Sequence, residues 1–289
     1  MNLSILLFQI LTGLAYGMLL FMMAAGLTII FGLLNVVNLA HGALFMVGGY
    51  VAFAFTKEHV NFWLALVIAV MIMAIIGVLI ERFLLGRMYG KELEQVLLTF
   101  GLIYIFTDTA KWIWGSTPRS IPIPEILDFS IPLGIVAFPA YRLFVVAVGI
   151  LIAILLWYIE TKTRVGAIVR AGVDDRHMLS ALGINFKLVF ASVFAFGAGM
   201  AGLSGVLGAP ILGLYTGMDA DVLLLSLVIV VIGGLKTWKG AFVSAILVGL
   251  VDTLGQVWFP QFSMVVIFVL MVIVLIIKPS GLFGKGVEA

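Results

Sequence analysis

Long runs of apolar residues, separated by short polar intervals, dominate the chain. One run covers about 5–34, a shorter one ends near Phe55, and the others cover about 62–80, 96–114, 142–159, 188–208, 222–233, 241–258 and 263–277. A helix needs roughly 20 apolar residues to cross a bilayer. The strict apolar–polar alternation of membrane barrel strands is absent from the sequence, which favours helices. The pattern predicts an all-α, polytopic membrane bundle of about 8–9 transmembrane segments, with 1–289 as one domain.

Two places interrupt this regular pattern. The first run is longer than one simple span needs, and small or polar residues follow it, namely Asn35, Asn38, His41 and Gly42. We interpret this as one span followed by a helix that is broken near 35–42. The run at about 222–233 is unusually short. Asp219 and Asp221 precede it, and it ends at a glycine pair. A short, glycine-interrupted segment is typical of a half-helix at a transport site.

The distribution of lysine and arginine predicts the orientation, because these residues are concentrated in cytoplasmic loops. They crowd the connection after about residue 80, the stretch at about 161–187 and the tail. The Pro-rich connection at about 115–141 contains only Arg119, with Arg142 at its edge. We therefore expect a cytoplasmic loop at about 161–187, an external loop at about 115–141 and a cytoplasmic C-terminus. Nine crossings would place the N-terminus outside, and eight would place it inside.

The predicted cytoplasmic loop, TRVGAIVRAGVDDRHMLSALGIN, is too long and too charged for a plain connector. Asp174 can cap a helix over about 175–182, Asp175 is favourable in its first turn, and Gly183 is a normal C-terminal residue. We expect this helix to dock on a cytoplasmic partner. The residues proposed for docking are Gly172, Asp174, Asp175, Arg176, Met178, Ala181, Leu182 and Gly183. The alternative is a solvated helical loop that only orients the protein by its charge.

Polar residues inside apolar runs are costly and usually functional in a membrane protein. The candidates for a solute pathway are Asn35, Asn38, His41, Gly42 and Asp252. For Asn38 and His41, hydrogen bonding that stitches the broken helix to its neighbours is an equal alternative. For Asp252, a structural hydrogen bond is favoured over contact with a substrate. Asp108 and Lys111 are three residues apart, so we expect them to pair near the outer interface.

Small residues recur at Gly197, Ala201 and Gly205, four apart along one predicted helix. Such a face allows tight packing of helices. We expect it to pack within this chain, with an interface between subunits as the less favoured alternative.

Composition narrows the possible functions. The chain is 64% hydrophobic and 10% charged, which leaves too little polar surface to cover a soluble core. Its net charge of +2 is too small to indicate nucleic acid, and it has no cysteine for a disulfide or a thiolate metal site. The sequence has no P-loop, GxSxG or HExxH motif, and its three histidines are scattered. We therefore expect a transport protein without enzymatic activity, metal or cofactor of its own, whose ATP energy would come from a partner.

Several segments resemble the permease subunits of ABC importers for branched-chain (hydrophobic) amino acids. They are GLTIIFGLLNVVNLAHGALFMVGGYVA, LLTFGLIYIFTD, the predicted cytoplasmic loop followed by FAFGAGMAGLSGVLGAP, and VIGGLKTWKGAFVSAILVG with IIKPSGLFG. Their order and spacing carry the resemblance over nearly the whole chain. One departure is the turn with Lys236, Trp238 and Lys239, where many relatives carry a smaller, less charged turn.

The resemblance implies a coupling helix at about Val173–Gly183 that docks on an ATPase subunit. It also implies a second related permease subunit, two cytoplasmic ATPase subunits that bind ATP and Mg, an external substrate-binding protein, and a place in the lipid of the bacterial inner membrane. The chain would form about half of a pathway that works by alternating access.

Two questions stay open at the level of sequence. The first is the substrate, since relatives of this type also carry urea, short amides and organic acids, and much of the selectivity lies in the binding protein. The second is the class of transporter. The alternative is an ion-coupled secondary transporter of small organic solutes, with Asp252, Asp108 and His41 as its ion or proton relay.

Overall fold

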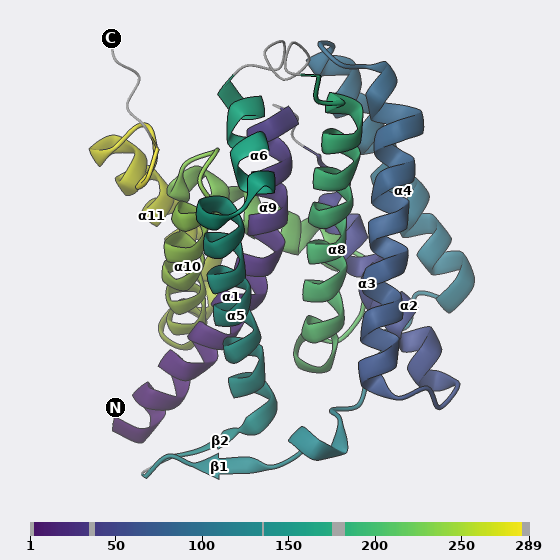
Figure 1. The fold of residues 1–289 in the computed structure, drawn as a ribbon. Helices are drawn as coiled ribbons and strands as arrows, with labels where there is room; N and C mark the ends of the chain where they lie inside the picture. Colours follow the sequence, from purple (N-terminus) through teal and green to yellow (C-terminus); the bar gives the residue numbers. More distant parts are fainter. Residues whose placement is uncertain (1–2, 35–37, 135, 175–182, 285–289) are drawn as a thin grey trace.

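The computed structural model describes residues 3–34, 38–134, 136–174 and 183–284 of the chain. In this part of the chain, long α-helices form a bundle (Figure 1). They are α1 (Leu3–Leu34), α2 (His41–Lys57), α3 (Phe62–Leu79), α4 (Glu92–Trp114), α5 (Ala140–Lys162), α6 (Arg164–Asp174), α8 (Phe186–Leu212), α9 (Met218–Gly233), α10 (Trp238–Trp258) and α11 (Ser263–Ile277). The predicted all-α, polytopic fold is confirmed.

Seven helical segments of the described residues are long and apolar enough to cross a membrane. They are Leu3–Gly32, Phe62–Arg87, Glu92–Trp114, Ala140–Lys162, Phe186–Leu212, Trp238–Trp258 and Pro260–Ile277. Each coincides, within a few residues, with an apolar run of the sequence. Capping residues fix two of the starts, since the side chains of Asn61 and Asn185 accept hydrogen bonds from the first turns of α3 and α8. The two remaining helices inside the bundle, α2 and α9, have 17 and 16 residues, slightly fewer than the shortest of these segments, which has 18.

The first apolar run forms one continuous helix. α1 has 32 residues and is about 48 Å long at 1.5 Å per residue, well above the roughly 30 Å of a hydrocarbon core. It crosses the bundle obliquely (Figure 1), which accommodates this extra length. Residues Met18 to Ala25 are all buried, so the middle of α1 is the centre of the core. The described chain resumes at Asn38 in a short non-helical stretch, and α2 begins at His41.

The two predicted loops lie at opposite ends of the bundle. The 115–141 connection and the start of α1 lie at one end, and α6 lies at the other (Figure 1). The 115–141 connection contains an antiparallel hairpin of β1 (Ser130–Pro132) and β2 (Ala137–Pro139) that the sequence did not predict. Its prolines stand at strand ends, where a missing N–H group costs least. We call these the hairpin end and the α6 end.

The sequence also did not predict the irregular end of α3. A π-helical turn over Ile80–Leu84 and a 3₁₀ turn over Leu85–Arg87 follow it. The Glu81 carboxylate is buried there and accepts a hydrogen bond from the Tyr89 hydroxyl. Such turns mark places where a side chain or packing demand overrides regular helix geometry.

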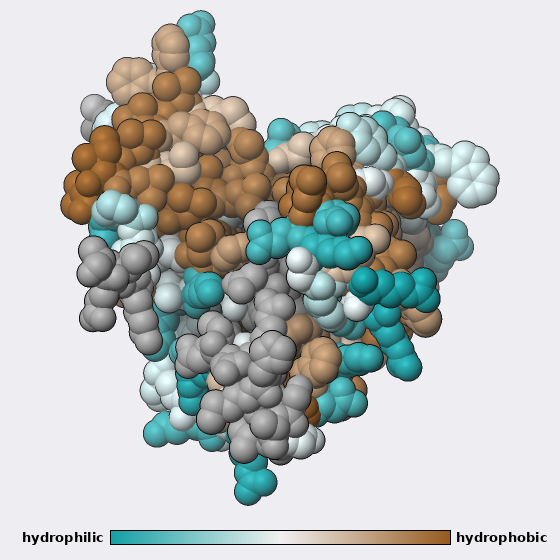
Figure 2. All heavy atoms as spheres, turned by 90° about the horizontal axis from the view of Figure 1, so that it is seen from above, coloured by the Kyte–Doolittle hydropathy of each residue, from teal (hydrophilic) through white to brown (hydrophobic). Residues whose placement is uncertain are grey.

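The flanks of the bundle are apolar. Large hydrophobic side chains are exposed along α3, α4, α5 and α11, for example Met71, Ile105, Leu151 and Ile276. Figure 2, which looks onto the α6 end, shows hydrophobic residues over large parts of the surface and hydrophilic residues gathered in separate groups. A surface of this kind is suited to contact with lipid or with another membrane subunit.

Candidate functional site

Two helices, α2 and α9, begin inside the bundle, and their N-terminal ends meet. Nε2 of His41, the first residue of α2, lies 3.1 Å from the carbonyl oxygen of Met23, near the middle of α1. A Cβ atom on Gly42 would overlap the carbonyl oxygen of Asp219, the second residue of α9, and would lie 2.8 Å from Cβ of Leu223. Only a glycine allows this close approach. We call this place the α2–α9 junction.

From the junction the two helices run in opposite directions. α2 runs toward the hairpin end, because the Tyr50 ring stacks on Trp114, which ends α4, at 5.2 Å between centroids. α9 runs toward the α6 end, because Gly233 accepts a hydrogen bond from Phe283 N, in the tail that follows α11, at 3.1 Å. The N-terminus of a helix carries a partial positive charge. Both positive ends therefore lie at the junction, and neither has a hydrogen bond from an N-cap side chain.

Three buried polar side chains belong to the junction. Asn38 and His41 are 0% exposed and Asp219 is 4% exposed. The Thr107 hydroxyl of α4 donates to Oδ2 of Asp219 at 3.0 Å. Within the described residues, both amide atoms of Asn38, Nδ1 of His41 and Oδ1 of Asp219 have no hydrogen-bond partner. Buried polar atoms are nearly always paired in proteins, so four unpaired atoms at one place point to a missing partner.

The structure brings together most of the residues predicted for the pathway. Asn38, His41 and Gly42 all lie at the α2–α9 junction, while Asn35 lies outside the described residues. Asp219 joins them from a distant part of the sequence. Hydropathy could not distinguish it from Asp221, which instead accepts a hydrogen bond from the Tyr215 hydroxyl at 2.8 Å.

Asp252 stands apart from the junction. It is buried on α10 and accepts a hydrogen bond from Nε2 of Gln256 at 2.8 Å, which supports the favoured structural role. It follows Gly249, which packs against Gly13 of α1. The α2–α9 junction contacts α1 at Met23 instead. Gly13 and Met23 are ten residues apart, which is about 15 Å along the axis of α1.

Asp108 also lies away from the junction. Its carboxylate is 3.3 Å from Nζ of Lys111, and both side chains are exposed. The predicted pairing of Asp108 and Lys111 is thus confirmed. The pairing explains why both charged residues are present without an ion or proton relay through Asp108.

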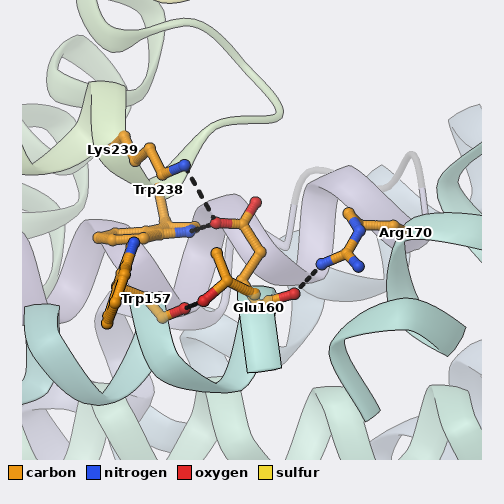
Figure 3. Close-up of polar contacts among 6 residues, drawn as sticks. Trp157, Glu160, Arg170, Trp238 and Lys239 are labelled. Atoms are coloured by element: carbon orange, nitrogen blue, oxygen red, sulfur yellow. Dashed lines mark hydrogen bonds and ion pairs between the residues drawn. The ribbon is translucent and has the colours of Figure 1, made fainter. Parts of the chain in front are cut away.

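A second cluster ties three helices together at the α6 end (Figure 3). Oε2 of Glu160, near the end of α5, accepts a hydrogen bond from Nε1 of Trp238 at 2.9 Å. The same oxygen lies 3.4 Å from Nζ of Lys239. The main-chain oxygen of Glu160 accepts a hydrogen bond from the guanidinium of Arg170 on α6. α6 is therefore linked through one residue of α5 to the first residues of α10.

Three of the residues predicted for docking fall within the described chain. Gly172 is buried in α6, Asp174 is the last described residue of that helix, and Gly183 has a left-handed φ of 74°, as a helix-ending glycine does. The predicted helix over about 175–182, with Asp175, Arg176, Met178, Ala181 and Leu182, lies outside the described residues.

The small-residue face of α8 packs within the chain, as predicted. Gly197 packs against Gly26 of α1, and Gly205 packs so closely on α2 that a Cβ there would overlap the carbonyl oxygen of Phe45. These contacts hold α1, α2 and α8 together beside the α2–α9 junction.

Comparison with known proteins relates this architecture to one family. The family model for the permease component of the branched-chain amino acid transport system matches residues 9–275. The high-affinity branched-chain amino acid transport system permease protein BraD of Pseudomonas aeruginosa is 25% identical, over 96% of this chain and 95% of that protein. The corresponding protein LivH of Escherichia coli is 26% identical, with the same coverage.

A solved structure shares the fold. The structure of PsaBC from Streptococcus pneumoniae in complex with Fab matches with a TM-score of 0.51 and 12% identity, over 92% of this chain and 89% of that one. At this identity the likeness concerns the fold alone. The family match covers nearly all of the helical bundle, including α2, α9 and their junction. The chain is therefore a member of the family of permease components of branched-chain amino acid transport systems.

Proposed function

We propose that the chain is the transmembrane permease subunit of an ATP-driven ABC importer. It forms part of the pathway for branched-chain or other hydrophobic amino acids, or for a related small amphiphilic solute, and works by alternating access. The observation that carries this proposal is the family match over residues 9–275. The names of the relatives, which are permeases of branched-chain amino acid transport systems, support the choice of substrate.

The proposed pathway runs past the α2–α9 junction. α2 and α9 add two shorter segments to the seven long helical segments, which favours nine segments over eight. α2 is then the second part of a helix broken near 35–42, and Asn35, Asn38, His41 and Gly42 lie at the break. With nine segments the N-terminus is external, at the hairpin end, and the C-terminus is cytoplasmic, at the α6 end. Asp252 serves a structural role beside this pathway.

The loop at about 161–187 is proposed to couple this chain to the ATPase. Movement of the loop would reach α5 and α10 through Glu160, which contacts Arg170, Trp238 and Lys239. α10 begins beside the end of α9, where Gly233 and Gly240 are in contact. A shift of the loop can thus be passed along α9 to the junction.

The partners follow from the same proposal. They are a second related permease subunit, two cytoplasmic ATPase subunits that bind ATP and Mg, and an external substrate-binding protein that docks at the hairpin end, beside the external loop at about 115–141. The complex lies in the inner membrane of a bacterium, and this chain itself has no enzymatic activity.

Uptake of radiolabelled leucine by proteoliposomes tests the proposal. The liposomes contain the complete importer, and the binding protein is added outside. We expect uptake that needs both ATP and the ATPase subunits. Uptake by this chain alone, driven by an ion gradient, would contradict the proposal and support the secondary transporter.

A coupling variant tests the docking loop in the same assay. Gly172→Trp combined with Ala181→Arg places bulk and charge in the proposed docking element, so ATP-driven uptake should fall at least about tenfold, the effect of 1.4 kcal/mol. Gly101→Ala is the matched control, because a Cβ at Gly101 meets no atom within 4 Å. Normal uptake by the double variant would refute the assignment of the docking element.

A further inference from the structure

We propose that the α2–α9 junction binds the charged head of an α-amino acid, with Asp219 holding the ammonium group and Asn38 and the N-terminus of α2 holding the carboxylate. This inference rests on the proposed transport function and deepens it, because it assigns the residues that recognise the charged head of the solute.

The first argument concerns Asp219, whose carboxylate is buried among membrane helices. A buried charge of this kind is costly unless a cation or several donors balance it. Its hydrogen-bond partner is the neutral Thr107 hydroxyl, which donates to Oδ2 and leaves Oδ1 unpaired within the described residues. No lysine or arginine of the described chain forms an ion pair with it. The N-terminus of α9, in whose first turn Asp219 stands, balances part of this charge, and a substrate ammonium would supply the missing hydrogen-bond donor and the remaining charge.

The second argument concerns the start of α2. Its N-cap residue, Ala40, offers no side-chain acceptor, and of its first N–H groups that of His41 donates to the Asn38 carbonyl at 3.1 Å. The partial positive charge of the helix start lies at the junction. Asn38, directly before the helix, is fully buried, and both of its amide atoms are unpaired within the described residues. Its NH₂ group can donate to a carboxylate. Such an end of a broken helix is a recurrent site for anionic groups of transported solutes.

His41 adds a further buried polar group at the start of α2. Because Nε2 of His41 lies 3.1 Å from a carbonyl oxygen, it carries the proton in the neutral ring. Nδ1 is then an acceptor, which suits an ammonium. Ser226 is one turn beyond Leu223 on the face of α9 that contacts Gly42, and its buried hydroxyl is also unpaired in the described structure. It extends the site toward the α6 end.

The arrangement fits a zwitterion better than the other candidate solutes. The residue that carries the acceptor carboxylate, Asp219, touches the uncapped start of α2 through its main chain, so each charge of an α-amino acid has a complement at the junction. Urea has no charge to offer either group, and an organic acid would bring a second negative charge to Asp219. The junction is closed in this structure because Gly42 and Asp219 are in direct contact. Alternating access would open it by separating α2 from α9.

Equilibrium binding to the complete importer in nanodiscs, without the binding protein, tests the site. Radiolabelled leucine is the probe, with and without ATP, since one of the two states should open the junction. The competitors are 4-methylpentanoate, which lacks the ammonium group, and 3-methylbutylamine, which lacks the carboxylate. We expect leucine to bind at least about tenfold more tightly than either competitor, because each lacks one charge-assisted hydrogen bond.

Variants then assign each charge to its residue. In Asp219→Asn, leucine should lose its advantage over 4-methylpentanoate, and in Asn38→Leu it should lose its advantage over 3-methylbutylamine. Ser204→Ala is the control for packing damage, because the Ser204 hydroxyl donates to the Leu19 carbonyl at 2.8 Å and so has its own partner. This control should keep both preferences.

The outcomes separate this inference from the proposed function. If the wild-type importer shows ATP-driven leucine uptake but binds both competitors as tightly as leucine, or binds none of the three, the site is refuted and the function stands. Retention of the full preference for leucine by Asp219→Asn also refutes the site. Absence of ATP-driven uptake of any amino acid refutes the function. The comparison of ligands on the wild-type importer needs no variant, so poor folding of a variant cannot hide the result.

Discussion

At the scale of single residues, Glu160 is the contact that joins α5, α6 and α10. Its carboxylate meets Trp238 and Lys239, and its main chain meets Arg170. The ion pair to Lys239 is partly exposed and is worth at most about 1 kcal/mol. The hydrogen bond from the partly buried indole contributes more to the position of α10, since without Glu160 the N–H group loses its partner.

We predict graded effects at Glu160. Glu160→Ala removes the acceptor of the Trp238 N–H group and should raise the number of ATP molecules hydrolysed per solute imported by about threefold or more, an effect of about 0.6 kcal/mol on coupling. Glu160→Gln keeps an oxygen acceptor and should stay near the wild-type ratio. ATP hydrolysis and uptake measured in the same proteoliposomes check this. Equal ratios for all three proteins would refute the role of Glu160 in coupling.

Asp252 distinguishes the two classes of transporter. Asp252→Asn keeps an oxygen that accepts from Gln256, so uptake should remain within about twofold of wild type if the role is structural. Asp252→Leu removes this partly buried hydrogen bond, while the exposed amide of Gln256 can turn to water, so it should lower stability by only about 0.5–1.5 kcal/mol. Abolished uptake by a folded Asp252→Asn protein would instead favour a proton or ion relay.

At the scale of elements, the close packing of α2 on α8 positions the α2–α9 junction. The start of α2 has no cap and no full span to anchor it, so its position depends on contacts with its neighbours. Glycines allow these contacts at several levels, for example at Gly48, where an added Cβ would lie 2.6 Å from Cα of Gly202. Loss of one glycine should therefore displace the helix that carries the junction.

Two glycine variants test this packing. Gly205→Ala places a methyl group on the Phe45 carbonyl and should cost about 1–3 kcal/mol by overpacking. Gly101→Ala, on the open face of α4, should be neutral or slightly stabilising because alanine favours a helix. Thermal unfolding of the purified proteins in detergent checks the difference. Equal melting temperatures would contradict the tight α2–α8 contact.

Hydropathy predicted most elements, because a helix in lipid must be apolar along its full length. The runs at about 241–258 and 263–277 became α10 and α11 with nearly the same limits. The hairpin that contains Ile131 was missed, since its Pro-rich, exposed strands lack both length and alternation. The contact of Gly42 with Asp219 also could not be predicted from the sequence, because it depends on how α2 and α9, which are far apart along the chain, pack on each other.

At the scale of the whole molecule, the contacts of Glu160 at the α6 end and the α2–α9 junction lie along one route of conformational change. The α6 end carries the proposed contact with the ATPase, and the junction lies within the bundle, where α9 begins. α9 and α10 connect the two through the contact of Gly233 with Gly240. The apolar flanks of α3, α4, α5 and α11 leave room for lipid and for a second permease subunit.

Purification of the tagged chain from its native membranes, followed by mass spectrometry, tests the central claim most directly. We expect ATPase subunits and a second permease subunit to accompany it in fixed proportion, and the purified complex to take up leucine only with ATP. A chain that is recovered alone, and that transports its solute when only an ion gradient is applied, would contradict the account.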